Sequence, residues 1–195
     1  MPRIEPIPYD ALDPDLKQRF EAGRLDGRYP WTENLQVFAY AKTYALANDE
    51  AYRITFRHGL LGPRIEELLR IHSAQINGCA SCQRAVKDDT ISDEDVACML
   101  STVDDPSYSE RERRALQFLE QFNRDHHAID DDTFRRLAEV FTIAEIVELG
   151  DICARFIGAH RWTNILDTFG PEEAVLTYDP TQVNASSATE IAAPE

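Results

Sequence analysis

Apolar residues recur through the middle of the chain at the three- and four-residue intervals of amphipathic helices. Over residues 33–56 this spacing predicts a long helix, with Asn48 and Asp49 as the point where it can break. Residues 63–78 begin with Pro63 and end with Gly78. Proline is tolerated in the first turn and glycine is favoured just past the end, so this segment is predicted to be a helix with both ends marked.

Three later helices are predicted from capping boxes, in which a hydroxyl and a carboxylate three residues apart satisfy free backbone amides reciprocally. The pairs are Ser92 with Asp95, Ser109 with Glu112, and Thr142 with Glu145. No alternating β-branched run is bounded by a two-residue hairpin turn. The predicted fold class is therefore all-α.

The two ends of the chain lack this periodicity. Residues 1–32 hold five of the ten prolines, and we expect an irregular N-terminal arm there. Residues 179–195 are small and polar and have no aromatic side chain, so we expect a flexible C-terminal tail. Between them, residues 33–178 are predicted to form a single helical domain, since 195 residues with 43% hydrophobic content suffice for one core.

The net charge of −15 restricts the possible partners. Such a chain repels a phosphate backbone, so nucleic acid and anionic membranes are excluded as expected partners. No apolar run approaches the roughly eighteen residues of a membrane-spanning helix, and the first residues lack the apolar run of a secretory signal. We expect a cytoplasmic protein, in which Cys98 and Cys153 are buried as small hydrophobic residues.

The remaining thiols lie close together in the segment "NGCASCQRAV". Gly78 ends one helix, so Cys79 and Cys82 are expected in or beside the first turn of the next, where backbone amides and the helix dipole stabilise a thiolate. A pair at this spacing can cycle between dithiol and disulfide. A zinc site with ligands recruited from elsewhere, or an inert structural pair, stays open as an alternative. We favour the redox interpretation and predict no metal and no cofactor.

Glu67 is the unusual residue of the helix that precedes the thiols. On a helical wheel, Ile65, Leu68, Leu69, His72 and Ile76 form one apolar stripe. Glu67 falls in a second, narrower row with Ile71 and Ala74. It is either a partly exposed carboxylate paired with Arg64 or Arg70, or a desolvated proton acceptor. The nearby thiols favour the second interpretation.

Two histidines are candidates for a substitute base or for pocket residues. His72 lies on the apolar stripe and is interpreted as a hydrogen-bonded core residue, with a base as the alternative. His160 lies in a late helix whose apolar face includes Phe156 and Ile157, and it is a candidate pocket residue.

The residues from Glu67 to Cys82 resemble a known family. A glutamate twelve positions before the first cysteine, an "INGC" lead-in and a Cys-X-X-Cys pair are similar to the carboxymuconolactone decarboxylase family and its alkylhydroperoxidase D-like branch. Residues 109–123 and 137–169 also resemble helices of that family. The resemblance implies an all-helical unit that assembles as a homo-oligomer, a trimer or a hexamer, with the thiols near a pocket between helices.

The resemblance also implies roles for individual residues. Cys82 matches the cysteine that attacks a peroxide, Cys79 the one that resolves it, and Glu67 the proton-relay glutamate. The family often has a histidine four residues after the second cysteine and sometimes one between the cysteines, but Val86 and Ser81 stand there. Activation of Cys82 must then come from helix amides, Arg84, Lys87 or a histidine from elsewhere in the chain.

The predicted function is a thiol-dependent peroxidase that reduces organic hydroperoxides. Its disulfide would be re-reduced by a dithiol partner, such as a lipoyl-bearing protein. Two alternatives remain at this point. One is a carboxymuconolactone decarboxylase-type lyase, which needs proton transfer and no sulfur chemistry. The other is a non-catalytic oligomeric binding protein.

Overall fold

The computed structural model describes residues 2–29, 33–56, 58–85 and 87–168, and within these ranges it contains helices and no strand. The α-helices are α1 (Pro14–Leu25), α2 (Glu33–Phe38), α3 (Lys42–Thr55), α4 (Pro63–Ile76), α5 (Ala80–Arg84), α6 (Asp93–Ser101), α7 (Glu110–Arg124), α8 (Asp131–Ala138) and α9 (Ile143–Leu166). Single 3-10 turns lie at Tyr9–Ala11, Ala39–Ala41 and His126–Ala128. The all-α prediction is confirmed for the described residues.

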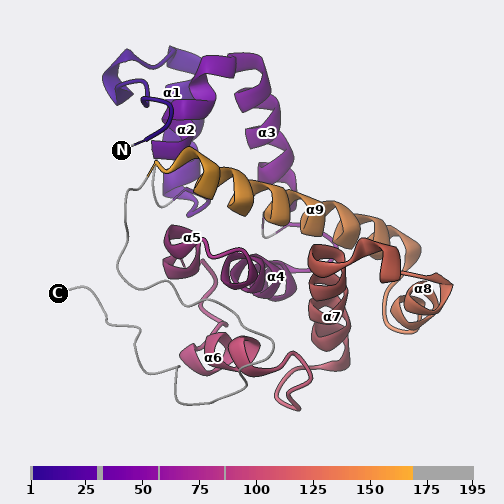
Figure 1. Ribbon diagram of the computed structural model, residues 1–195. Helices are drawn as coiled ribbons and strands as arrows, with labels where there is room; N and C mark the ends of the chain where they lie inside the picture. The colour runs from indigo at the N-terminus through magenta and orange to yellow at the C-terminus, as the bar shows by residue number, and fades with distance from the viewer. Residues whose placement is uncertain (1, 30–32, 57, 86, 169–195) are drawn as a thin grey trace.

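Helix α4 runs through the centre, with α5, α6, α7 and α9 packed around it (Figure 1). Every residue from Ile65 to Gln75 is buried. One face of α4, with Leu69, packs against the apolar sides of α7 and α9. Another side of α4, with Leu68 and Ile71, packs against α6. A helix with neighbours on several sides buries apolar residues on more than one face, which fits the two rows seen in its sequence.

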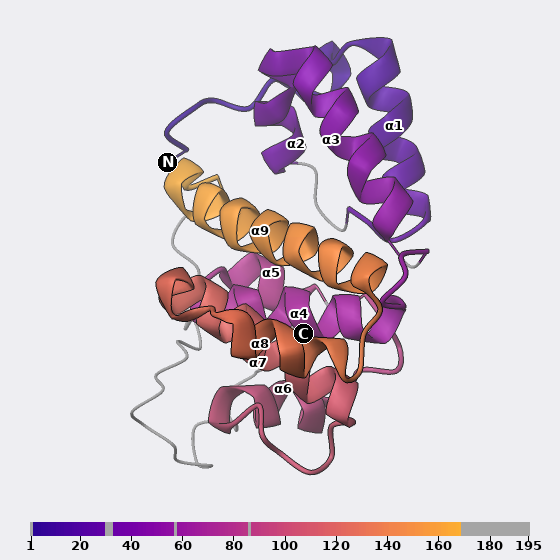
Figure 2. The ribbon, with the colours of Figure 1, turned by 90° about the vertical axis from the view of Figure 1, so that its right-hand side faces the viewer.

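Helices α1, α2 and α3 form a separate layer, and α9 lies between this layer and α4 (Figure 2). The prediction of an irregular arm over residues 1–32 is wrong for α1. Asp13 caps this helix and Pro14 occupies its first turn, where no backbone N–H is needed. Leu16 and Phe20, both buried, pack in one apolar cluster with Leu35 of α2. The prolines therefore mark helix starts and turns as well as irregular chain.

The predicted break near Asn48 and Asp49 is also wrong. The interruption lies at Ala39–Ala41, and residues 48 and 49 are inside α3. Aspartate weakens a helix when its side chain competes for nearby backbone groups. Here the Asp49 carboxylate accepts a hydrogen bond of 2.6 Å from Arg28 Nη1 instead. Its partner comes from outside the helix, so α3 continues through it.

The three capping boxes are confirmed, and each begins the helix that it predicts: α6, α7 and α9. Helix α4 begins at Pro63 as expected and ends at Ile76, two residues before Gly78. Gly78 has a φ of 64°, a left-handed conformation that glycine adopts without strain.

The other sequence expectations are met in part. Cys153 is fully buried as predicted, whereas Cys98 is only half-buried. The tail at 179–195 lies outside the described residues, so the predicted domain limits at 33 and 178 stay a prediction. Within the described ranges, no helix has the length and apolar character needed to cross a membrane.

Candidate functional site

The two neighbouring cysteines lie at the start of α5. Cys79 is the residue that precedes this short helix, and its N–H donates to the Ala74 carbonyl at 2.9 Å. Gly78 makes the turn that brings α5 back toward α4. Cys79 and Cys82 form a disulfide with their Cα atoms 5.3 Å apart. The structure thus pairs the two cysteines that the Cys-X-X-Cys spacing predicted to pair.

The two sulfurs differ in their surroundings. Cys79 is fully buried, whereas Cys82 is half-buried and lines a cavity. The Ser81 hydroxyl lies 3.7 Å from Cys79 Sγ and 3.9 Å from Cys82 Sγ. A small molecule in the cavity can therefore reach Cys82, while Cys79 lies behind it. In the described part of the chain, no group of three or more His, Cys, Asp or Glu side chains is placed to hold a metal ion.

The cavity has a volume of about 190 Å³ and lies where α2, α3, α5 and α9 meet beside α4. Its walls are mainly apolar, with Leu35 and Phe38 from α2 and Phe156 and Ala159 from α9. Four basic residues also line it: Arg28, Arg70, Lys87 and Arg155. An apolar hollow with a few placed polar groups is typical of a small-molecule site.

Glu67 and Arg70 form a buried ion pair, each with 4% of its surface exposed. Arg70 donates from Nε and Nη2 to the two carboxylate oxygens of Glu67, both at 2.7 Å. Burial acts to lower the pKa of Arg70, but the hydrogen bonds and charge of Glu67 outweigh it and the pKa is raised. The pairing with Arg70 is the one considered from sequence, but the pair is buried instead of partly exposed.

This ion pair holds the thiol segment in place. Arg70 Nη1 donates to the Cys82 carbonyl at 2.5 Å, and its Nη2 donates to the Ala85 carbonyl. The Lys87 N–H donates to Glu67 Oε1 at 2.6 Å. Glu67 itself is not among the residues that line the cavity. Its contacts are those of a residue that positions α5 and the following turn.

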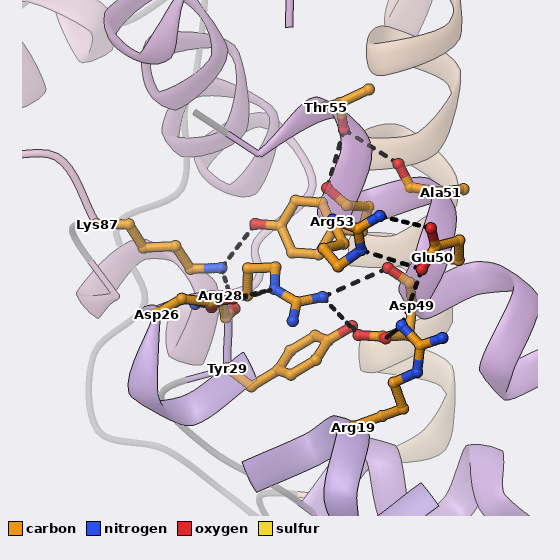
Figure 3. Close-up of polar contacts among 11 residues, drawn as sticks. Arg19, Asp26, Arg28, Tyr29, Asp49, Glu50, Ala51, Arg53, Thr55 and Lys87 are labelled. Carbon is orange, nitrogen blue, oxygen red and sulfur yellow. Dashed lines mark hydrogen bonds and ion pairs between the residues drawn. The ribbon is translucent and has the colours of Figure 1, made fainter. Parts of the chain in front are cut away.

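Lys87 brings an amine to the same cavity. Its Nζ donates to the Arg28 carbonyl at 2.6 Å (Figure 3). It also donates to the Tyr52 hydroxyl at 2.9 Å. The rings of Tyr52 and Phe56 also lie beside it. Burial lowers the pKa of Lys87 to about 7, with Arg70 acting in the same direction and Glu67 opposing. Near neutral pH both the charged and the neutral form are present, as proton transfer requires.

The position of Lys87 depends on a buried polar network from the N-terminal layer. Figure 3 shows Arg28 reaching Asp49, with its Nη1 2.6 Å from Asp49 Oδ1. The Tyr29 hydroxyl donates to the same oxygen at 2.8 Å. Arg28 Nε also pairs with Asp26 Oδ2 at 2.8 Å. These contacts fix the Arg28 backbone, whose carbonyl accepts from Lys87.

The two candidate histidines have different positions. His72 is fully buried outside the cavity lining, with Nδ1 3.2 Å from Gln75 Oε1 and Nε2 3.0 Å from Glu120 Oε1. These are the contacts of the hydrogen-bonded core histidine expected from sequence. His160 lines the cavity, stacks on Phe156 and has its Nδ1 3.0 Å from Ser73 Oγ.

The environment of His160 disfavours a proton on its ring. Burial, together with the charges of Arg70 and Lys87, lowers the pKa of His160 to about 3. A neutral imidazole is therefore present at physiological pH and accepts a proton poorly. Of the other substitutes considered from sequence, Arg84 is exposed and outside the lining, whereas Lys87 faces the cavity. Val86 lies outside the described residues.

Sequence reasoning missed most of the cavity residues, among them Arg28, Tyr52 and Arg155. Arg155 and Ala159 lie four residues apart on α9, with Thr163 a further four residues on. This spacing places them on one helix face with His160 nearby. Arg155 lies five residues before the candidate His160, an interval that does not place two side chains on one helix face, so spacing from His160 did not mark it. Nothing local marks Arg28 and Tyr52, whose roles depend on contacts between layers.

Comparisons with known proteins give one informative likeness. No protein-family model matches the sequence, and no curated protein matches it. Among solved structures, the chain is similar to the crystal structure of an alkylhydroperoxidase AhpD core, an uncharacterized peroxidase-related protein from Ralstonia eutropha JMP134. The two share 20% identity with a TM-score of 0.64, over 88% of this chain and 93% of the other. The chain therefore has the alkylhydroperoxidase D-like fold, as its resemblance to that branch implied.

Proposed function

We propose that this protein is a thiol-dependent peroxidase that reduces small organic hydroperoxides with its Cys79–Cys82 pair. The observation that carries the proposal is a disulfide at the wall of a cavity, with Cys82 facing the cavity and Cys79 behind it. The similarity in fold to a peroxidase-related protein supports the same activity.

The cycle begins with the reduced pair. The Cys82 thiolate attacks the terminal oxygen of the hydroperoxide, the O–O bond breaks, and the products are a Cys82 sulfenic acid and an alkoxide that takes a proton to become an alcohol. The Cys79 sulfur then attacks Cys82 Sγ, and water leaves as the disulfide forms. An external dithiol returns two electrons and two protons, which restores both thiols and leaves the partner oxidised.

We assign proton delivery to Lys87 in place of the histidine that the family often carries. The charged Lys87 favours the Cys82 thiolate and can donate a proton to the leaving alkoxide. Its pKa of about 7 allows the proton to be regained between turnovers. The contacts of Glu67 favour a positioning role through Arg70 over the proton-relay role inferred from the resemblance.

The partners inferred from the resemblance belong to this proposal. We propose a homo-oligomer, a trimer or a hexamer, and a lipoyl-bearing or other dithiol as reductant. Phe134, Ile143 and Val147 on α8 and α9 are large apolar side chains that the single chain leaves exposed, which fits an interface between subunits. A cytoplasmic location, where dithiol reductants are abundant, fits the cycle. Sedimentation equilibrium would determine the number of subunits.

The experiment follows consumption of cumene hydroperoxide with dihydrolipoamide as the reductant. Cys82→Ser should abolish turnover. Cys79→Ser should give at most one rapid equivalent and leave a sulfenic acid that dimedone traps. Cys98→Ser is the matched control, because Cys98 lies outside the cavity, and it should retain the wild-type rate. Equal hydroperoxide consumption by the wild type and Cys82→Ser would refute the proposal.

The role of Lys87 has its own test in the pH dependence of kcat/KM. The wild-type profile should bend near pH 7, where Lys87 loses its proton. Lys87→Met should lack this bend and react more slowly below pH 7. An unchanged profile in Lys87→Met would assign proton delivery to another group.

A further inference from the structure

The charge of the cavity lining is opposite to that of the whole chain. The protein has 35 acidic and 20 basic residues, yet the cavity is lined by four basic residues and, within the described part of the chain, by no aspartate or glutamate. Cavity walls of low dielectric constant strengthen the electrostatic field of such charges. The cavity is therefore suited to an anion although the protein as a whole repels anions.

Three of the four basic groups have partners within the protein. Arg28 pairs with Asp26 and Asp49. The Arg70 guanidinium is bound by Glu67. The Lys87 amine donates to the Arg28 carbonyl and to the Tyr52 hydroxyl. Carboxylates therefore occupy Arg28 and Arg70, and the Lys87 amine has partners within the protein beside the proton-delivery role proposed above.

Arg155 is different. Its side chain is half-buried and lines the cavity, and among the described residues it makes no hydrogen bond or ion pair. A guanidinium presents five donors in a planar fork that matches a carboxylate. An arginine partly withdrawn from water beside an apolar wall, with no internal partner, has the features of a ligand-binding residue.

A second unpartnered polar atom lies elsewhere in the lining. Asn34 donates from Nδ2 to Thr163 Oγ1 at 3.0 Å, but its Oδ1 is buried and has no hydrogen-bond donor. Arg155 and Thr163 are eight residues apart on α9, which corresponds to about 12 Å along the helix axis. The cavity thus offers an anion-binding group at Arg155, with the apolar Phe156 and Ala159 between Arg155 and Thr163 on α9.

The size of the cavity limits the ligand further. An apolar cavity of about 150 Å³ is known to hold benzene. The cavity here, at about 190 Å³, therefore accommodates a single ring with short substituents, or a short alkyl chain.

We propose that the cavity binds small amphipathic carboxylates, with the carboxylate on Arg155 and the apolar body against Phe156 and Ala159. Given the peroxidase activity proposed above, the substrate class is a small aryl or alkyl hydroperoxide that carries a carboxylate. The carboxylate site itself does not depend on that activity, since Arg155 is not part of the thiol pair.

Binding of an anion should be coupled to the protonation of Lys87. Both side chains line one cavity, and a bound negative charge favours the ammonium form. Because the pKa of Lys87 lies near 7 in the empty cavity, Lys87 is mainly neutral at pH 8. Binding at pH 8 should therefore take up protons from the buffer.

The first test measures binding to the oxidised protein by calorimetry, with 4-isopropylbenzoate and 4-isopropylbenzamide as a pair of matched shape. The carboxylate should bind at least about tenfold more tightly, since hydrogen bonds to charged groups are the stronger ones. Arg155→Gln should reduce that preference about tenfold, and Arg155→Lys should restore part of it. Arg135→Gln is the control, because Arg135 is an exposed residue of α8 paired with Asp132. Equal binding of the two compounds, or an unchanged preference in Arg155→Gln, would overturn the proposal.

The second test compares turnover of cumene hydroperoxide with that of its 4-carboxy derivative. The ratio of their kcat/KM values should favour the carboxylate and fall about tenfold in Arg155→Gln. If neither hydroperoxide is consumed but benzoate binding still depends on Arg155, the peroxidase proposal fails and the anion site stands. If both are consumed with a ratio that Arg155→Gln does not change, the peroxidase proposal stands and the carboxylate class is wrong.

Discussion

Replacing Glu67 by glutamine should leave the Arg70 guanidinium buried without its charged partner. Both residues are 4% exposed, and the carboxylate accepts two hydrogen bonds from Arg70 and one from the Lys87 amide. Breaking a buried ion pair by removing one partner costs about 3–5 kcal/mol. The charge of Glu66 also acts on Arg70 and offsets part of this loss. The expected decrease in the free energy of unfolding is therefore about 3 kcal/mol, at the lower end of that range.

Urea unfolding followed by far-UV circular dichroism measures this change. Glu110→Gln is the matched control, since Glu110 is an exposed glutamate that pairs with Arg113 and Arg114. Exposed pairs are worth at most about 1 kcal/mol, so this variant should unfold nearly as the wild type does. A loss of under about 1 kcal/mol in Glu67→Gln would refute the reasoning, because Arg70 would then not depend on its partner.

A double variant separates the pair from its surroundings. The double variant Glu67→Gln, Arg70→Met leaves no unpaired charge of this pair in the interior. Its loss of unfolding free energy should therefore be smaller than the sum of the losses in the two single variants. The coupling expected for residues in direct contact is about 0.5–3 kcal/mol. Strict additivity would mean that the two side chains contribute independently of each other.

Three further predictions concern the cavity and the helix ends. The pKa of Lys87 is about 7, below the ordinary value of 10.5, so Lys87 opposes folding most strongly below pH 7 and progressively less as the pH rises toward 10.5. The free energy of unfolding of the wild type, taken relative to that of Lys87→Met in urea titrations, should thus increase between pH 7 and pH 9. A decrease would show that folding does not lower the pKa of Lys87. Ser92→Ala removes the N-cap of α6 and should lower thermal stability by about 1 kcal/mol, with no loss expected if solvent replaces the cap. Gly78→Ala introduces a side chain at a φ of 64° with no atom within 4 Å, so calorimetry should show only the backbone strain of about 1–2 kcal/mol. A much larger loss would indicate that α5 itself is displaced.

Local signals predicted most of the helices from sequence. Pro63 and the hydroxyl–carboxylate pairs at 92, 109 and 142 mark helix starts because they satisfy backbone groups within one turn. The prediction that residues 1–32 are irregular was wrong for α1, because the prolines were given more weight than the four-residue spacing of Leu12, Leu16 and Phe20. The prediction of a break in α3 was wrong for another reason, since the partner of Asp49 lies in a different part of the fold.

The sequence predicted some residues of the candidate site and not others, because contacts between distant parts of the chain leave no local signal. The sequence alone determined that Cys79 and Cys82 lie at a helix start, since Gly78 ends the preceding helix, and that His160 belongs to an apolar helix face. It also indicated Glu67, but the role of Glu67 depends on Arg70, Lys87 and the carbonyl of Cys82 together. Capping and short-range spacing act within a few residues, so they can be read along the chain.

Only the tertiary structure decided which charges face the cavity and which are neutralised. Arg28 and Arg70 are occupied by carboxylates, Lys87 is desolvated beside Tyr52, and Arg155 has no partner among the described residues. These four residues come from three different layers of the fold, and their electrostatic states depend on distances of a few ångströms between those layers. Burial and pairing are properties of the packed molecule, which is why charge placement in the cavity followed from the fold and not from the order of residues.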